Sequence, residues 1–152
     1  MTEIRQTRRV ITGLDADGRS TVIIDGPAPV WGETGGRVWR TDSYPADNSS
    51  MTDCPDEPFS FEMMESGSST CMVHEFSPGI GEYWHATNSL DYIVMLEGEV
   101  ELQLETGPVT VRAGDVLVDR GVIHSWRNES GHPARAVIIA IPALPVGKGR
   151  SV

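Results

Sequence analysis

Two histidines stand in the parts of the sequence best suited to chemistry. His85 lies two residues before Thr87, and Asp91 follows after a short polar stretch. Residues two apart share one face of a β-strand, so His85 and Thr87 would point the same way. His124 lies in a second string, two residues before Trp126. An interior His–Asp pair can act as general acid and base, because the pKa of histidine lies close to neutrality.

The elements that would position these residues are β-strands. From Cys71 onward, short apolar runs alternate with turn sequences, and Glu99–Leu104 alternates strictly between polar and apolar residues. Such alternation is typical of a sheet with one solvated face. Short strands without a convincing helix between them predict an all-β barrel or jelly roll. The predicted strands are Cys71–Phe76, Tyr83–Thr87, Asp91–Leu96, Val100–Leu104, Val109–Arg112, Val116–Val118, Ile123–Arg127 and Ala136–Ile141.

The 152 residues are expected to form one folded domain with four parts. Residues 1–40 are predicted to be an N-terminal arm or edge strands, and residues 41–70 an acidic loop rich in Ser and Pro. One short helix is expected in this loop, around residues 61–65. Residues 71–142 would form the barrel and residues 143–152 a C-terminal tail. A loop this long inside a compact domain is either functional or disordered.

Charge and composition exclude several classes of function. The net charge of −10 argues against nucleic-acid or anionic-membrane partners, since both need a basic face. Residues 41–111 contain no Lys or Arg, which predicts a solvated acidic surface or acids that face a cation. No apolar run is long enough for a membrane span, and no secretory signal is expected. Cys54 and Cys71 lack metal or disulfide spacing, so a reducing cytoplasm is the expected location.

The two histidine strings resemble the paired motifs of the cupin superfamily. His85 holds the first histidine position of the first motif, Thr87 the second, and Asp91 the glutamate position, with Gly98 in register. The second motif corresponds to residues 114–128, where the usual proline is absent and one residue is missing. The resemblance covers about half of the chain. It implies a single cupin barrel, which is a double-stranded β-helix or jelly roll, and a homodimer.

A closer resemblance is to one subgroup of small bacterial and fungal cupins. That subgroup carries a His-x-Thr-x-Ser-x-Asp-Tyr string, which matches residues 85–92 here. It also carries an Arg-Gly-x-x-His-x-Trp string, which matches residues 120–126. Some fungal members belong to aromatic polyketide pathways. No activity belongs to the subgroup as a whole, so the resemblance leaves the reaction open.

The cupin resemblance implies one metal ion inside the barrel, at the positions of His85, Thr87, Asp91 and His124. A threonine hydroxyl is a poor ligand, which leaves two imidazoles and one carboxylate. Such a triad suits iron(II) and is compatible with manganese, nickel or zinc. His74 on the preceding strand is a possible further ligand. The alternative is that no metal binds, and that His85, Asp91 and His124 are acid–base or hydrogen-bonding residues of a pocket.

The substrate pocket is expected to contain five further side chains. Ile93 and Met95 share the face of the Asp91 strand that points inward, together with Thr87. Trp126 is either a core residue or an aromatic wall for a planar substrate. Arg120 either forms a salt bridge with a neighbouring aspartate or holds an anionic substrate.

Two functions are consistent with these residues. The first is an enzyme that acts on a small organic molecule inside the barrel, as an oxygenase, isomerase, cyclase or decarboxylase. The second is a non-catalytic ligand-binding module with a degenerate metal site. No helix-turn-helix string is present, which argues against binding to DNA. The sequence does not identify the substrate.

Overall fold

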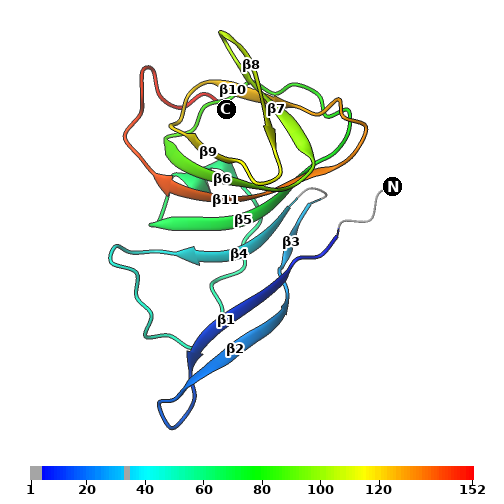
Figure 1. Cartoon of the computed structure of the whole chain (residues 1–152). Helices are drawn as coiled ribbons and strands as arrows, with labels where there is room; N and C mark the ends of the chain where they lie inside the picture. Colours follow the sequence, from blue (N-terminus) through cyan, green and yellow to red (C-terminus); the bar gives the residue numbers. More distant parts are fainter. Residues whose placement is uncertain (1–4, 33–34) are drawn as a thin grey trace.

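The computed structural model describes residues 5–32 and 35–152 and is built almost entirely from β-strands (Figure 1). One turn of 3-10 helix, η1 (Phe61–Met64), lies within the acidic loop, where a short helix was expected. The all-β prediction is confirmed. The strands are β1 (Arg8–Leu14), β2 (Ser20–Pro27), β3 (Val30–Trp31), β4 (Gly35–Thr41), β5 (Ser69–Phe76), β6 (Ser89–Glu97), β7 (Glu99–Leu104), β8 (Gly107–Arg112), β9 (Val116–Asp119), β10 (His124–Arg127) and β11 (Ala134–Pro142).

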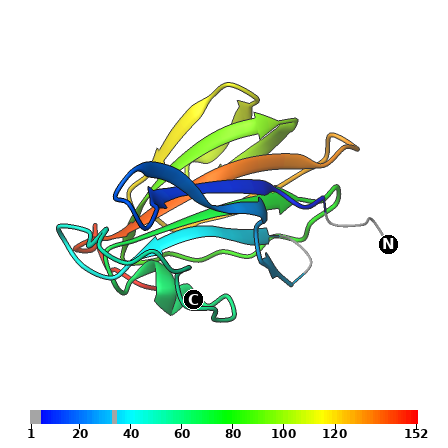
Figure 2. The ribbon, with the colours of Figure 1, turned by 90° about the horizontal axis from the view of Figure 1, so that it is seen from below.

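Two sheets enclose the core of the molecule. The larger has the strand order β3-β4-β5-β11-β6-β9, and the smaller has the order β10-β7-β8. Figures 1 and 2 show the smaller sheet lying over β6 and β11. Along β6, Asp91, Ile93 and Met95 are buried while the residues between them are more exposed, as alternation predicts. The core between the sheets contains Phe76, Ile93, Met95, Val100, Val111, Ala134 and Ala136.

Strands β1 and β2 form a separate antiparallel hairpin beside this body (Figure 1). A two-stranded hairpin is marginally stable alone, so it depends on contacts with the rest of the chain. The Ala28 N–H donates to the Thr7 carbonyl at 2.7 Å, and Arg9 reaches from β1 to the Val38 carbonyl at 3.1 Å. In the described part of the chain, no helix is long and apolar enough to cross a membrane.

The strand predicted at Tyr83–Thr87 is wrong. Only two isolated bridges occur there, one between His85 and His124 and one between Ala86 and Ser151. The segment has two different neighbours in succession, so neither pairs with it for long enough to form a strand. The apolar–polar pattern of a sequence cannot reveal this, because it does not show which segment lies alongside.

Gly121 allows a close approach of two segments beside His124. Its φ of +74° lies in the left-handed region, which favours glycine. A Cβ atom at this position would lie 2.5 Å from the Thr87 carbonyl oxygen and 3.0 Å from the Ser89 carbonyl oxygen. The turn before β10 can therefore pack against residues 87–89 only with glycine here.

We expect Gly121→Ala to lower the free energy of unfolding by about 3 kcal/mol, from backbone strain and steric overlap together. Gly131→Ala is the matched control, because Gly131 has φ +81° but no atom within 4 Å of an added Cβ. The free energy of unfolding of this control should fall by only about 1 kcal/mol. Urea unfolding of both variants measures the difference. Equal losses would contradict the packing role of Gly121.

Candidate active site

The fold brings His85 and His124 into direct contact. Each backbone N–H donates to the other residue's carbonyl, at 2.9 Å and 3.0 Å. The two imidazole rings are 4.4 Å apart between centroids. His124 is 4% exposed, whereas His85 is only partly buried. A small molecule could therefore approach the pair from the His85 side.

Hydrogen bonds to the backbone fix the tautomer of both rings. His85 Nδ1 lies 2.9 Å from the Tyr83 carbonyl oxygen, and His124 Nδ1 lies 2.9 Å from the Val122 carbonyl oxygen. A carbonyl oxygen only accepts hydrogen bonds, so each Nδ1 carries the proton. In the neutral ring, Nε2 then holds a lone pair. Both histidines thus offer Nε2 as a base, a hydrogen-bond acceptor or a metal ligand.

Asp119 at the end of β9 orients His124 from behind. Its Oδ2 lies 3.1 Å from His124 Nδ1, and the two side chains are 2% and 5% exposed. Its Oδ1 accepts the Gly121 N–H at 3.0 Å and the Val122 N–H at 3.3 Å, which fixes the turn that carries His124. The carboxylate thus lies on the Nδ1 side of the ring and leaves the Nε2 side free of this contact.

The Asp91 carboxyl group is engaged by a hydroxyl group and is not grouped with His85 and His124 as a metal ligand. Its carboxylate accepts the Ser89 hydroxyl at 2.7 Å, and the Ser89 oxygen lies 2.8 Å from the Thr87 hydroxyl oxygen. Burial raises the pKa of Asp91 to about 7, the nearby charge of Asp119 adds to the rise, and the Ser89 hydrogen bond opposes it. Asp91 and Thr87 therefore belong to a buried chain of hydroxyl and carboxyl groups.

The structure does not bring His85, Asp91 and His124 together as a group of three metal ligands. In residues 5–32 and 35–152, no group of three His, Cys, Asp or Glu side chains is arranged to hold a metal ion. The Nε2 atoms of His85 and His124 are in the state that metal ligands require. Asp119, however, contacts the Nδ1 side of His124, and Asp91 is engaged by Ser89. Two donors remain where the resemblance implied at least three.

Aromatic rings surround the histidine pair. The ring centroid of Phe61 in η1 lies 5.2 Å from that of His85, and the ring centroid of Tyr83 lies 5.4 Å from that of His85. Trp126 is 5.8 Å from His124. Burial lowers the pKa of His85, the nearby His124 lowers it further, and the bond to Tyr83 opposes the shift. His85 is thus favoured in its neutral form.

The other predicted pocket residues differ in their distance from the histidine pair. Ile93 and Met95 are core residues, 2% and 1% exposed. Trp126 packs against Phe76 with centroids 4.8 Å apart, so it contributes to the core as well as to the wall beside His124. Arg120 is exposed and forms no ion pair with any described residue. His74 lies further along the barrel wall, in contact with Phe76.

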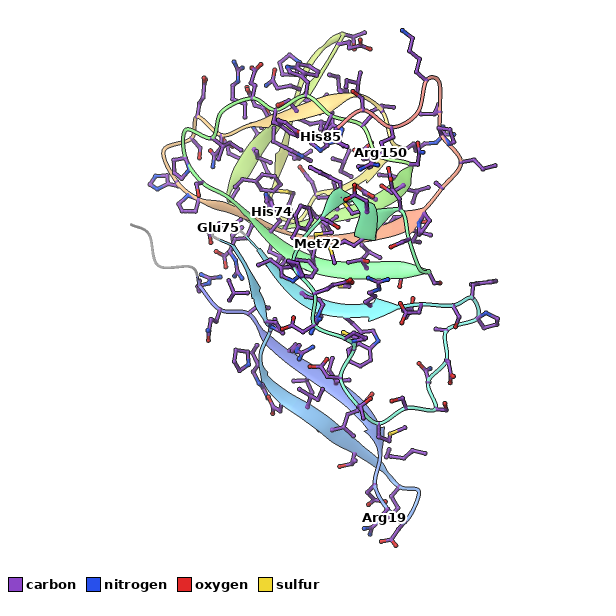
Figure 3. The ribbon with its side chains drawn as sticks, turned by 180° about the vertical axis from the view of Figure 1, so that it is seen from behind. Arg19, Met72, His74, Glu75, His85 and Arg150 are labelled. Atoms are coloured by element: carbon purple, nitrogen blue, oxygen red, sulfur yellow. The ribbon has the colours of Figure 1, made fainter. Side chains whose placement is uncertain are left out.

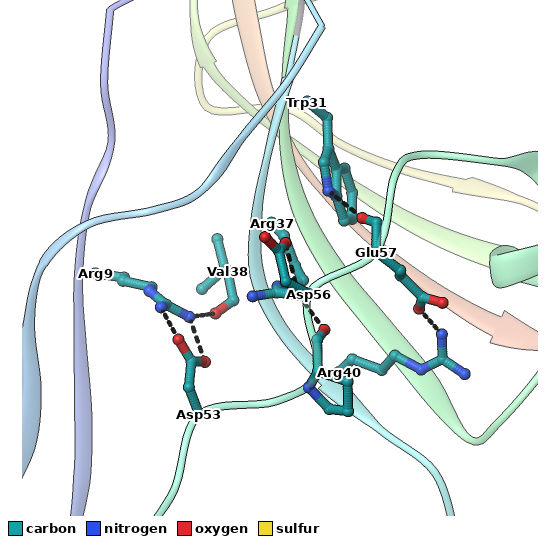
Figure 4. Close-up of polar contacts among 9 residues, drawn as sticks. Arg9, Trp31, Arg37, Val38, Arg40, Asp53, Asp56 and Glu57 are labelled. Carbon is teal, nitrogen blue, oxygen red and sulfur yellow. Dashed lines mark hydrogen bonds and ion pairs between the residues drawn. The ribbon is translucent and has the colours of Figure 1, made fainter.

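The acidic loop is held to the sheets by arginine–carboxylate pairs, which Figure 4 shows. Arg37 is only 1% exposed, donates to the Pro55 carbonyl and lies 3.4 Å from the Asp56 carboxylate. These contacts explain why a polar segment is ordered next to the site, and they place Phe61. The three pairs join strands β1 and β4 to successive loop residues: Arg9–Asp53, Arg37–Asp56 and Arg40–Glu57.

The C-terminal tail closes another side of the site. Arg150 lies 2.7 Å from Glu62 and 3.4 Å from Glu65, which belong to η1 and its end. Ser151 pairs with Ala86, directly beside His85. Figure 3 shows Arg150 and His85 at the same end of the molecule. Neither contact was predicted from the sequence, because both depend on where the tail runs.

Comparison with known proteins supports the resemblance to cupins. Residues 72–140 match the family model described as a cupin domain. The chain is 34% identical to the oryzines biosynthesis cluster protein J of Aspergillus oryzae, over 93% of this chain and 86% of that protein. The chain belongs to the cupin superfamily. This cupin is also 34% identical to the phomopsin biosynthesis cluster protein D of Diaporthe leptostromiformis, over 95% of this chain and 82% of that protein.

Two further proteins extend the comparison. The cupin-domain-containing oxidoreductase srdD of Neurospora crassa is 29% identical over 98% of this cupin and 83% of its own length. A solved double-stranded β-helix protein from Klebsiella pneumoniae is 21% identical, with a TM-score of 0.46, and covers 61% of this cupin and 100% of its own chain.

Asp91 should make the stability of this cupin fall as the pH rises. Its pKa is raised to about 7 in the folded protein and is ordinarily 3.8. Between these values the unfolded chain loses its proton first, so folding is penalised progressively up to neutral pH. Asp91→Asn keeps an acceptor for Ser89 but cannot ionise. Between pH 5 and pH 8 the variant should gain about 2 kcal/mol of unfolding free energy relative to the wild type.

Urea unfolding across this pH range measures the effect. Asp17→Asn in the exposed turn between β1 and β2 is the matched control. Its pH profile should run parallel to that of the wild type. A parallel profile for Asp91→Asn as well would show that Asp91 is not held protonated by burial.

Proposed function

We propose that this cupin is an enzyme that transfers protons on a small organic molecule at the His85–His124 pair. The observation that carries this proposal is the buried contact of 3.1 Å between Asp119 and His124 Nδ1. A carboxylate, an oriented imidazole and a free Nε2 form the arrangement of a general base with its positioning residue.

The geometry assigns different tasks to the three residues. His124 Nε2 takes a proton from the substrate and later returns it to another substrate atom. Asp119 stabilises the imidazolium that exists between these two steps, without contacting the substrate. His85 stays neutral, and its Nε2 accepts a hydrogen bond from the substrate at the outer end of the pair. Isomerisation, cyclisation and decarboxylation can proceed by such proton transfers and need no second reactant.

The names of the relatives support action on small molecules. Two of those named above are biosynthesis cluster proteins, and a third is called an oxidoreductase. We infer that this cupin belongs to the same subgroup, which the strings at residues 85–92 and 120–126 define. The acid–base chemistry proposed here rests on this chain's own residues, His124, Asp119 and His85.

Untargeted mass spectrometry tests the proposal without knowledge of the substrate. The purified protein is incubated with a metabolite extract of its own source, and the mixture is denatured before analysis. An enzyme gives a new compound, whose mass difference from the compound consumed identifies the reaction type. A binding module instead returns its ligand unchanged on denaturation. Unchanged ligands alone would overturn the enzymatic proposal.

The variants His124→Ala and Asp119→Asn test the assigned roles. His124→Ala should abolish product formation. Asp119→Asn should slow it by about a hundredfold or more, because the neutral amide no longer stabilises the imidazolium. His132→Ala in an exposed turn is the control and should leave the rate unchanged. A normal rate in Asp119→Asn would contradict the positioning role.

Metal-dependent catalysis is the second candidate, and the two free Nε2 atoms favour it. The missing third donor opposes it, so we expect protein purified without chelators to contain well below one metal ion per chain. Elemental analysis of wild type and the double variant His85→Ala/His124→Ala measures this. Stoichiometric iron, manganese, nickel or zinc that is lost in the variant would replace the acid–base proposal with a metal-dependent one.

A further inference from the structure

A second possible binding site lies outside the cupin motifs, next to β5. A cavity of about 360 Å³ opens there, in the size range of pockets for small ligands. Among the described residues, none of those that line it carries a charged side chain. The side chains that line it are Trp31, Pro58, Phe59, Met72, Val73 and His74.

His74 is the polar group of this cavity. The described residues provide no hydrogen bond or ion pair for its imidazole. The ring packs edge-on against the Phe76 ring, with centroids 4.6 Å apart. Gly35 lies beside the ring, because a Cβ added there would lie 3.9 Å from His74 Nδ1 and 3.1 Å from the Val73 carbonyl oxygen. A neutral imidazole has one donor and one acceptor nitrogen, so a ligand can satisfy both.

The aromatic wall of the cavity is held in place. Trp31 Nε1–H donates to the Glu57 carbonyl at 3.0 Å, and the Glu57 side chain is paired with Arg40 (Figure 4). Phe59 follows two residues later, with its ring 5.9 Å from that of Trp31. The arginine–carboxylate pairs of the loop therefore preform this wall before any ligand arrives, which reduces the entropy lost on binding.

We propose that this cavity binds a flat, uncharged molecule of about one or two rings, which packs against Trp31 and Phe59 and exchanges hydrogen bonds with His74. A charged ligand is disfavoured, because its charge would lose hydration on entering the cavity and the described lining residues offer no opposite charge in return. The site is separate from the histidine pair. Phe61 lies between Phe59 and His85, and Phe76 and Trp126 lie between His74 and His124.

The probes are three naphthalenes with a neutral, an anionic and a cationic substituent: 2-naphthol, 2-naphthoate and 2-naphthylmethylammonium at pH 7. Titrations followed by tryptophan fluorescence give each dissociation constant. Transferred magnetisation from probe protons to the Met72 methyl group shows whether the probe occupies this cavity. We expect 2-naphthol to bind at least about tenfold more tightly than both ions. Equal binding of the ions, or no contact with Met72, would overturn the proposal.

Variants separate the two parts of the site. Phe59→Ala should weaken 2-naphthol binding about tenfold, and its 43% exposure makes it tolerable for folding. His74→Leu should weaken binding by about fivefold, while His74→Gln should restore most of it because an amide also donates and accepts. His132→Leu is the control. Unchanged affinity in both Phe59→Ala and His74→Leu would overturn the site.

The result does not depend on the proposed enzymatic function. His124→Ala should bind 2-naphthol as the wild type does, because His124 does not line the cavity. If His124→Ala abolished binding, the probe would occupy the histidine pair, and the separate site would be wrong. If the cavity binds the probe and no metabolite is converted, the proposed enzymatic function fails while this inference stands.

Discussion

The buried contact between Asp119 and His124 is the constraint on which the site depends. A carboxylate with 2% exposure needs partners, and it finds them in His124 and in two backbone N–H groups of the turn. The turn is thereby fixed, and Gly121 lets it approach residues 87–89. His85 is then placed against His124 by a pair of backbone hydrogen bonds. The buried Asp119 carboxylate thus sets the geometry of the pair.

The polar loop around the site is ordered by charge rather than by a core of its own. Arg37 is almost fully buried and is met by Asp56 and the Pro55 carbonyl, while Arg9 and Arg40 hold further carboxylates. The Arg9–Asp53 contact is bidentate, which fixes orientation as well as distance. The segment that follows supplies the aromatic wall of the further cavity. A stretch with the composition of a flexible linker therefore becomes part of a defined surface.

Membership of the cupin superfamily explains the architecture and leaves the chemistry to individual side chains. Here a threonine replaces a motif histidine, and the motif carboxylate Asp91 is turned towards Ser89. The two remaining histidines keep their Nδ1 atoms occupied and their Nε2 atoms free. The same scaffold can thus hold a base instead of a metal, once a carboxylate sits behind one imidazole.

The sequence by itself determined the all-β fold, the alternation along β6 and the positions of His85 and His124 in the two motif strings. These follow from local periodicity and from motif spacing, which act over a few residues. Tertiary structure decided that Asp119, and not Asp91, partners His124, because β6 and β9 pair those two aspartates directly across the sheet. It also decided that Tyr83–Thr87 forms bridges instead of a strand and that Phe61 covers His85. Such contacts join distant segments, so no local pattern encodes them.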